Sequence, residues 1–290
     1  MTADAARLAC GEPARRTAPR GSREFVFTDA DFDRVRGLIH ARAGIALADG
    51  KENLVYSRLS RHVRDGGHRS IEAYLDALET GPISAWRRFV NALTTNHTGF
   101  FREAHHFDAL TEALCAGSGT RAIWCAGAAS GEEAWSVAIA ACEAFESLSP
   151  PVRILATDVD TDALALARRA VYAAERLAAV PETRRRRYFV THGTQGAAGV
   201  RPELRMLVSF QAHSLVAPLW PATAPLTTVF CRNVLIYFDR AARERVVARF
   251  HPMLRSDGLL CLGHSEALSP AHPLFKPHGR TVYVRRGAAT

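Results

Sequence analysis

The residues best suited to chemistry lie where an apolar run breaks into small residues and then into two adjacent carboxylates. The run Ile123–Ala126 is apolar, Gly127 and Gly131 bound a stretch of small residues, and Glu132 and Glu133 open the next predicted helix. Small residues let a ligand approach the backbone closely, as in the first loop of a nucleotide-binding α/β sheet. The stretch therefore predicts a site for a nucleotide-like ligand.

A second acidic position supports this interpretation. Asp158 ends the next apolar run, where such sheets carry the acceptor for ribose hydroxyls. The alternative role is a helix N-cap, but Asp160, Thr161 and Asp162 already offer caps. We therefore predict that Asp158 contacts the ligand.

The acidic loop favours a cationic adenosyl ligand over a dinucleotide. A G-x-G-x-x-G fingerprint is absent, since only Gly127 and Gly131 are glycines. Glu132 and Glu133 would repel phosphate but attract an amino group or a sulfonium, and S-adenosylmethionine carries both. Complementing the helix dipole is the alternative role, and we expect it to account for one of the two glutamates.

Two further segments carry polar residues that packing explains poorly. Asn233 follows the apolar run Thr228–Cys231, at the predicted carboxyl end of a central strand, where open α/β sheets bind ligands. Tyr237, among apolar neighbours, is by itself better explained as core. Upstream, Thr94–Glu103 is dense in polar residues and includes Arg102. This segment is predicted to fold over the ligand as a lid, and an interdomain linker with a surface arginine is the alternative.

The surrounding pattern predicts the elements that position these residues. Apolar residues at helical spacing, with caps such as Thr28 and Ser70, predict a small helical bundle. From Arg121 strands and helices alternate, which indicates a mostly parallel sheet with helices on both faces and a closing antiparallel hairpin. The expected division is a disordered basic tail (1–23), a helical domain (24–93), a linker and lid (94–120) and an α/β domain (121–290) with a small insert near 188–206.

The composition of the chain indicates which classes of partner and which cellular compartment to expect. The formal charge of +8 favours acidic partners: nucleic acid, an anionic membrane or an acidic protein surface. The six cysteines form no CxxC pair, and no His/Cys/Asp cluster has metal-ligand spacing, so no metal is expected. No apolar run approaches the ~18 residues of a membrane span, and no secretory signal is apparent. A cytoplasmic protein is predicted.

Five blocks together resemble the CheR family, S-adenosylmethionine-dependent methyltransferases that esterify glutamates on bacterial chemoreceptors. In chain order the similar blocks are TTNHTGFFREAHHF, IWCAGAASGEEAWS, ILATDVDTDALALAR, VFCRNVLIYFDR and LCLGHSEAL. The resemblance covers nearly the whole chain. It implies a Rossmann-like class I methyltransferase sheet after an all-α domain, S-adenosylmethionine as cofactor, S-adenosylhomocysteine as product, and the cytoplasmic helical domain of methyl-accepting chemoreceptors as partner.

The resemblance also implies roles for individual residues. Arg102 and Tyr237 are expected beside the transferable methyl group. Ser214 stands where the family usually has Asn or Asp. The residues implied to contact the cofactor are Asn96, Thr98, Arg102, Glu133, Asp158, Ser214, Leu215, Asn233 and Val234.

A basic stripe is the candidate receptor surface. Arg58, Arg61 and Arg64 recur every third residue on one face of a predicted helix. A plain solvated face is the usual explanation of such a run, but in this family such a stripe faces an acidic receptor helix bundle. A nucleic acid methyltransferase is disfavoured because Arg232-Asn-Val-Leu lacks the [DN]-P-P-[YF] motif. A non-catalytic S-adenosylmethionine-binding signalling protein is the remaining alternative.

Overall fold

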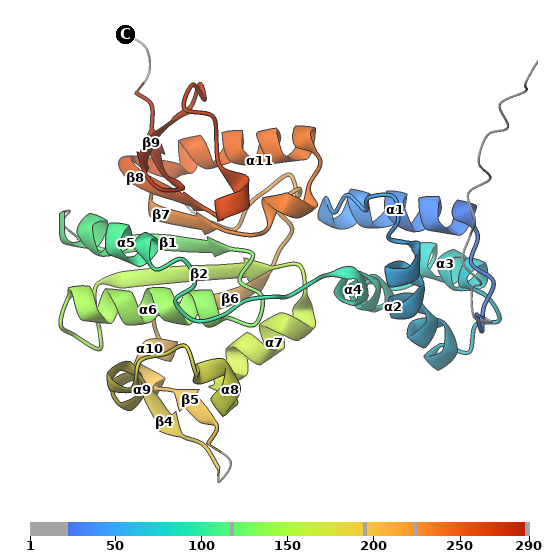
Figure 1. The fold of residues 1–290 in the computed structure, drawn as a ribbon, viewed down its shortest axis with the longest axis horizontal. Helices are drawn as coiled ribbons and strands as arrows, with labels where there is room; N and C mark the ends of the chain where they lie inside the picture. The colour runs from blue at the N-terminus through green and yellow to red at the C-terminus, as the bar shows by residue number, and fades with distance from the viewer. Residues whose placement is uncertain (1–22, 117–118, 194–195, 223–224, 288–290) are drawn as a thin grey trace, which may run out of the picture.

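The computed structural model describes residues 23–116, 119–193, 196–222 and 225–287. It contains a helical domain beside a larger α/β domain (Figure 1). The tail predicted over residues 1–23 lies outside the described residues, apart from Arg23.

The helical domain consists of α1 (Asp29–Ala43), α2 (Glu52–Asp65), α3 (Ile71–Glu79) and α4 (Ile83–Leu93). Thr28 and Ser70 cap α1 and α3 with their side chains, as predicted, and Gly44 ends α1 with a left-handed φ of 74°. The four helices pack on one shared apolar core. This core gives the domain its own hydrophobic centre, and α4 leads the chain directly towards the sheet.

The α/β domain is built on a seven-stranded sheet in the order β6-β2-β1-β7-β8-β10-β9. The first five strands of that order pair in parallel and the last two pairings are antiparallel. This confirms the predicted mostly parallel sheet and its closing hairpin. The strands are β1 (Arg121–Ala126), β2 (Val152–Asp158), β6 (Val208–Ala212), β7 (Leu226–Cys231), β8 (Leu254–Leu262), β9 (Phe275–Gly279) and β10 (Val282–Arg285).

Helices cover both faces of this sheet, as Figure 1 shows. Alternate residues of β1 point to opposite cores: Cys125 belongs to one apolar cluster and Trp124 to the other. The first cluster includes residues of α5 (His105–Ala116) and α6 (Glu132–Ala144), and the second includes residues of α11 (Arg240–Met253). The helix α7 (Thr161–Arg169) follows β2.

Two regions differ from the predicted organisation. The second half of the predicted linker folds as α5, because Phe107, Leu110 and Leu114 recur at helical spacing and are buried. The insert is larger than predicted, with a separate antiparallel sheet in the order β3-β5-β4. Its elements are β3 (Val171–Tyr172), α8 (Ala174–Leu177), α9 (Glu182–Tyr188), β4 (Phe189–Thr191), β5 (Ala198–Val200) and α10 (Pro202–Arg205).

Several contacts hold the helical domain against the α/β domain. The Ala46 N–H donates to the Tyr237 carbonyl oxygen at 2.7 Å, and His40 Nε2 lies 2.7 Å from Asp239 Oδ2. The Asn91 amide donates to Thr161 Oγ1 at 2.9 Å. These contacts bring both domains to the carboxyl end of the parallel strands. Within the part of the chain described, no helix combines the length and the apolar character needed to cross a bilayer.

Candidate functional site

A cavity of about 960 Å³, including space open to solvent, lies at the carboxyl ends of β1, β2, β6 and β7. This is where open α/β sheets bind ligands. The residues that line it come from both domains and from the lid segment, Thr94–Glu103. They are Ala43, Ile45, Leu93, Thr94, Thr95, Asn96, His97, Thr98, Gly99, Arg102, Gly127, Ala129, Glu133, Thr157, Asp158, Val159, His213, Leu215, Arg232, Asn233, Val234, Tyr237 and Phe238.

With one exception, the predicted cofactor and catalytic residues line this single cavity. The exception is Ser214, whose hydroxyl accepts the Val216 N–H at 3.4 Å, while its neighbours His213 and Leu215 line the cavity. A cofactor contact for Ser214 stays a prediction. Residues from four of the five sequence blocks, together with Leu215, therefore meet at one place.

The loop after β1 needs glycine at Gly127. Its φ is +100°, and a Cβ added there would lie 2.2 Å from Val234 Cγ2. The N–H groups of Gly127 and Ala128 both donate to the Thr157 carbonyl oxygen, at 2.8 and 2.9 Å. These two hydrogen bonds hold the loop against the end of β2, and the absence of a side chain at Gly127 lets Val234 pack against the loop backbone.

We expect Gly127→Ala to weaken cofactor binding by roughly tenfold or more, because the new methyl group displaces Val234 and strains the backbone. The measurement is the dissociation constant of S-adenosylhomocysteine by calorimetry. Gly99→Ala is the matched control, since it also lines the cavity but a Cβ there meets nothing within 4 Å. Equal affinities for the two variants would contradict this account of the loop.

The Asp158 carboxylate is fixed by the backbone. Its Oδ2 accepts the Ala129 N–H at 2.8 Å and its Oδ1 accepts the Asp160 N–H at 2.9 Å. Burial raises the pKa of Asp158 in spite of these hydrogen bonds. The N-cap of α7 is Asp160, whose Oδ1 accepts the N–H groups of Asp162 and Ala163. Asp158 is therefore free of the capping role and has acceptor lone pairs to offer a ligand.

Asp160 also holds the lid segment, a role that the sequence did not suggest. Its buried Oδ2 accepts hydrogen bonds from Thr94 Oγ1 and Asn96 Nδ2, both at 2.6 Å. One carboxylate thus caps α7 and anchors the residues that pass over the cavity.

The two adjacent glutamates have separate roles. Glu132 is buried and accepts hydrogen bonds from Arg176 and from Ser130 Oγ, away from the residues that line the cavity. Glu133 lines the cavity, and its Oε2 accepts a hydrogen bond from Arg232 Nη1 at 3.1 Å. Burial raises the pKa of Glu133, and the guanidinium beside it acts in the opposite direction. Only Glu133 of the pair lines the cavity, and its contact with the ligand stays a prediction.

A buried glutamate that we did not predict builds the loop after β7. Glu266 is fully buried, and its carboxylate accepts four backbone N–H groups at 2.7 to 3.2 Å. The donors are Asn233, Val234, Ile236 and Gly263. Asn233 has a left-handed φ of 60°, which the loop imposes on a residue that lines the cavity. A glutamate four residues after the apolar end of β8 is the sequence signal for this role.

The predicted catalytic pair lies at the same cavity. Arg102 is flanked by two residues with left-handed φ, Phe101 at 51° and Glu103 at 56°, and its Nη1 lies 3.5 Å from the His97 carbonyl oxygen. Tyr237 Oη donates to the Thr95 carbonyl oxygen at 3.5 Å. In the part of the chain that the structure describes, both polar groups make only long hydrogen bonds, so they are available to a ligand.

The basic stripe on α2 is divided. Arg58 donates to the carbonyl oxygens of Leu93 and Thr94 and to Thr95 Oγ1, at 2.8 to 3.0 Å, so it ties α2 to the lid segment. Arg61 and Arg64 are exposed, paired with Asp65 and Glu24 respectively. Arg61 and Arg64 thus remain the surface part of the stripe.

The residues present fit S-adenosylmethionine. Asp158 offers a fixed carboxylate to ribose hydroxyls, and the Glu133 carboxylate offers negative charge to an ammonium or sulfonium. Gly127 leaves the loop backbone bare at the cavity wall, where a Cβ would lie 2.2 Å from Val234 Cγ2. The carboxylates of Asp158 and Glu133 would repel a pyrophosphate.

Comparison with known proteins gives a consistent result. Residues 96–284 match the family described as CheR methyltransferase, SAM binding domain, and residues 30–94 match CheR methyltransferase, all-alpha domain.

Three relatives are similar over almost their full length. A chemotaxis protein methyltransferase of Klebsiella aerogenes is 42% identical over 259 residues, 88% of this chain and 89% of the relative. One of Escherichia coli is 40% identical over 260 residues, covering 89% and 91%. Chemotaxis protein methyltransferase 2 of Pseudomonas aeruginosa is 43% identical over 269 residues, covering 91% and 95%. The chain therefore belongs to the CheR methyltransferase family and uses S-adenosylmethionine as its cofactor.

Proposed function

We propose that the protein transfers a methyl group from S-adenosylmethionine to glutamate side chains of methyl-accepting chemoreceptors. The products are glutamate methyl esters and S-adenosylhomocysteine. The observation that carries this proposal is the presence of a guanidinium, Arg102, and a phenol, Tyr237, on the wall of the cavity that also holds Glu133 and Asp158. The relatives are named chemotaxis protein methyltransferases, in agreement with such a substrate.

The reaction requires little proton transfer by the protein. The glutamate substrate is ionised at neutral pH, so its carboxylate attacks without a general base. When bound, the cofactor supplies an electrophilic methyl group on a sulfonium. Arg102 holds the incoming carboxylate by charge-assisted hydrogen bonds, and Tyr237 orients it. Catalysis therefore consists of positioning and electrostatics.

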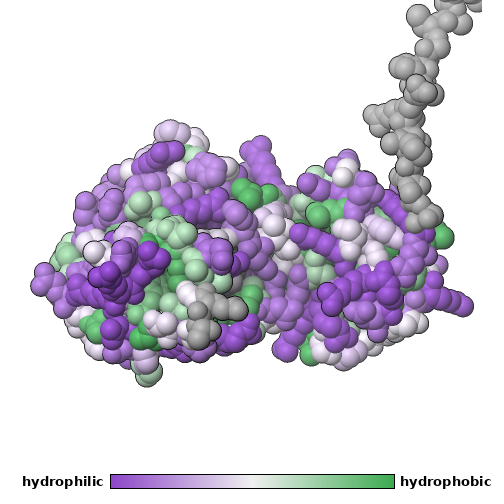
Figure 2. Space-filling model, turned by 60° about the horizontal axis from the view of Figure 1, so that its bottom comes forward, coloured by the Kyte–Doolittle hydropathy of each residue, from purple (hydrophilic) through white to green (hydrophobic). Residues whose placement is uncertain are grey.

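In this proposal, three parts of the chain have separate roles in docking the receptor, in catalysis and in binding the cofactor. The helical domain (24–93) docks the receptor, the lid segment carries Arg102, and the α/β domain (121–290) binds the cofactor. Arg58 links the first two, since it donates to Leu93, Thr94 and Thr95. The face of the helical domain seen in Figure 2 is mostly hydrophilic, as suits docking of a charged helix of the receptor's cytoplasmic domain.

We expect the double substitution Arg61→Glu, Arg64→Glu to raise KM for the receptor by roughly tenfold, because each reversal replaces attraction to an acidic helix by repulsion. The dissociation constant of S-adenosylhomocysteine should not change. The measurement is initial methylation rate against receptor concentration. Arg240→Glu on α11 is the matched control, since Arg240 is also exposed and paired one turn away. Unchanged receptor kinetics in the double variant would make the stripe a plain solvated surface.

The proposed function is tested by incubating the protein with labelled S-adenosylmethionine and the cytoplasmic domain of a candidate receptor. We expect label on glutamate residues when the receptor peptides are mapped by mass spectrometry. Tight cofactor binding with no transfer to any receptor domain would instead favour the non-catalytic signalling protein.

A further inference from the structure

Arg232 is a buried arginine at the junction of the lid segment and the cofactor site. Only 2% of its side chain is exposed. Its Nη1 donates to Glu133 Oε2 at 3.1 Å, and its Nη2 donates to the Arg102 carbonyl oxygen and lies 3.6 Å from Glu103 Oε2. One side chain therefore contacts the cavity glutamate of α6 and the main chain of the residue proposed for catalysis.

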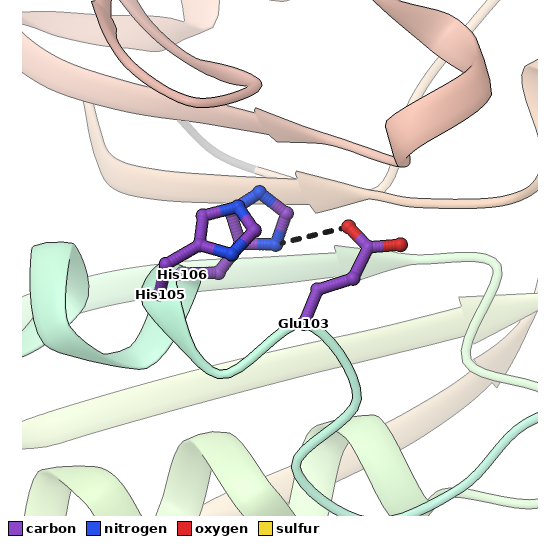
Figure 3. Close-up of side chains that lie close together, drawn as sticks. All are labelled: Glu103, His105 and His106. Carbon is purple, nitrogen blue, oxygen red and sulfur yellow. Dashed lines mark ion pairs between the residues drawn. The ribbon is translucent and has the colours of Figure 1, made fainter.

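Glu103 is the second anion beside this guanidinium. Figure 3 shows its carboxylate directed towards the imidazole of His106, with Glu103 Oε2 and His106 Nδ1 3.6 Å apart. Burial lowers the pKa of His106 to about 3, so its imidazole is neutral at pH 7. Glu103, His105 and His106 lie close enough to hold a metal ion, but Arg232 already supplies positive charge at the same carboxylate oxygen. We interpret Glu103, His105 and His106 as residues that support the Arg232 side chain.

We propose that Arg232 is a positioning residue for methyl transfer, holding the Glu133 carboxylate and the Arg102 main chain in one fixed arrangement. The planar fork of a guanidinium reaches both elements at once, which the single nitrogen of a lysine cannot do. Arg102 needs such support, because residues on both sides of it have left-handed φ. The inference rests on the roles proposed for Glu133 and Arg102.

The charge of Glu133 provides a readout that is specific to this role. Burial raises the pKa of Glu133, Arg232 lowers it, and Glu103 and Glu266 raise it. The Cys125 thiol nearby is buried and neutral, since burial raises its pKa. Arg102 is the other arginine among the residues that line the cavity, and its carbonyl oxygen accepts a hydrogen bond from Arg232. Without Arg232, Glu133 takes up a proton at higher pH and loses its attraction for the cofactor's ammonium group.

The test compares Arg232→Lys, Arg232→Met and the double variant Arg232→Met, Glu133→Gln. We measure the dissociation constant of S-adenosylmethionine between about pH 5 and about pH 6.5, where the cofactor's amino group stays protonated. Arg232→Lys should keep the affinity within about threefold but lower kcat by about tenfold, because the hold on Arg102 is lost. Arg232→Met should bind at least about tenfold more weakly, and increasingly so as the pH falls. In the double variant this pH dependence should vanish.

Arg121→Met is the matched control. Arg121 is also buried, and it donates to the carbonyl oxygens of Gly119 and Leu114, but it lies at the end of β1 opposite the cavity. It should keep the affinity and pH profile of the unsubstituted protein. The inference is overturned if Arg232→Lys keeps full kcat, or if a folded Arg232→Met binds the cofactor with unchanged affinity and pH profile. If even the unsubstituted protein methylates no receptor glutamate, the proposed function fails, while the binding data still decide the role of Arg232.

Discussion

Replacing Arg102 with alanine should lower kcat for receptor methylation by on the order of 100-fold, while cofactor affinity falls by less than tenfold. The reason is that Arg102 is proposed to hold the incoming glutamate carboxylate, and within the described residues its guanidinium makes one long contact, 3.5 Å to the His97 carbonyl oxygen. The measurements are steady-state methylation kinetics with saturating receptor and calorimetric binding of S-adenosylhomocysteine.

Arg102→Lys provides the comparison that separates charge from geometry. It keeps the positive charge but cannot offer a planar pair of donors, so its kcat should lie between those of the alanine variant and the unsubstituted protein. Normal turnover by Arg102→Ala would remove Arg102 from the mechanism. A loss of cofactor binding as large as the loss of kcat would make it a binding residue only.

Glu266→Ala should lower the free energy of unfolding by about 4 kcal/mol and abolish cofactor binding at micromolar concentrations. The substitution removes the acceptor of four backbone N–H groups, including those of Asn233 and Val234 at the cavity. Asn233 then loses the hydrogen bond from its N–H to Glu266, which helps to hold its left-handed φ of 60°. The measurements are urea-induced unfolding and calorimetric titration with S-adenosylhomocysteine.

Glu244→Ala is the control for the loss of a glutamate in the same domain. Glu244 is exposed and pairs with Arg240 one turn along α11, so its loss should change stability by less than about 0.5 kcal/mol. If Glu266→Ala were as stable as Glu244→Ala, the buried carboxylate would not be the support of this loop.

The sequence predicted those parts of the fold and of the site in which the position of a residue follows from its neighbours in the chain. Thr28 and Ser70 are good caps before periodic apolar residues, and both helices form there. Asp158, Glu133 and Asn233 each stand at the end of a strand or the start of a helix. Because parallel strands present their carboxyl ends at one edge, these residues meet at the cavity.

What the sequence did not predict depends on contacts between distant segments. Glu266 accepts hydrogen bonds from a loop about thirty residues away in the sequence. Arg232 contacts Glu133, which lies 99 residues away in the sequence. Nothing in the local pattern shows that Arg58 bonds the lid segment, or that Asp160 anchors Thr94 and Asn96. Such partners are set by tertiary packing, which determines where a charged side chain can satisfy its hydrogen bonds.

The most direct test of the central claim is the chemical nature of the transferred methyl group. After incubation with labelled S-adenosylmethionine, the receptor's cytoplasmic domain is exposed to mild base and the released label is measured. A carboxyl methyl ester predicts that the label is released as methanol, and that a receptor with glutamine at the modified positions takes up none. Label that resists base, or that appears on nitrogen, would contradict the proposed glutamate methylation.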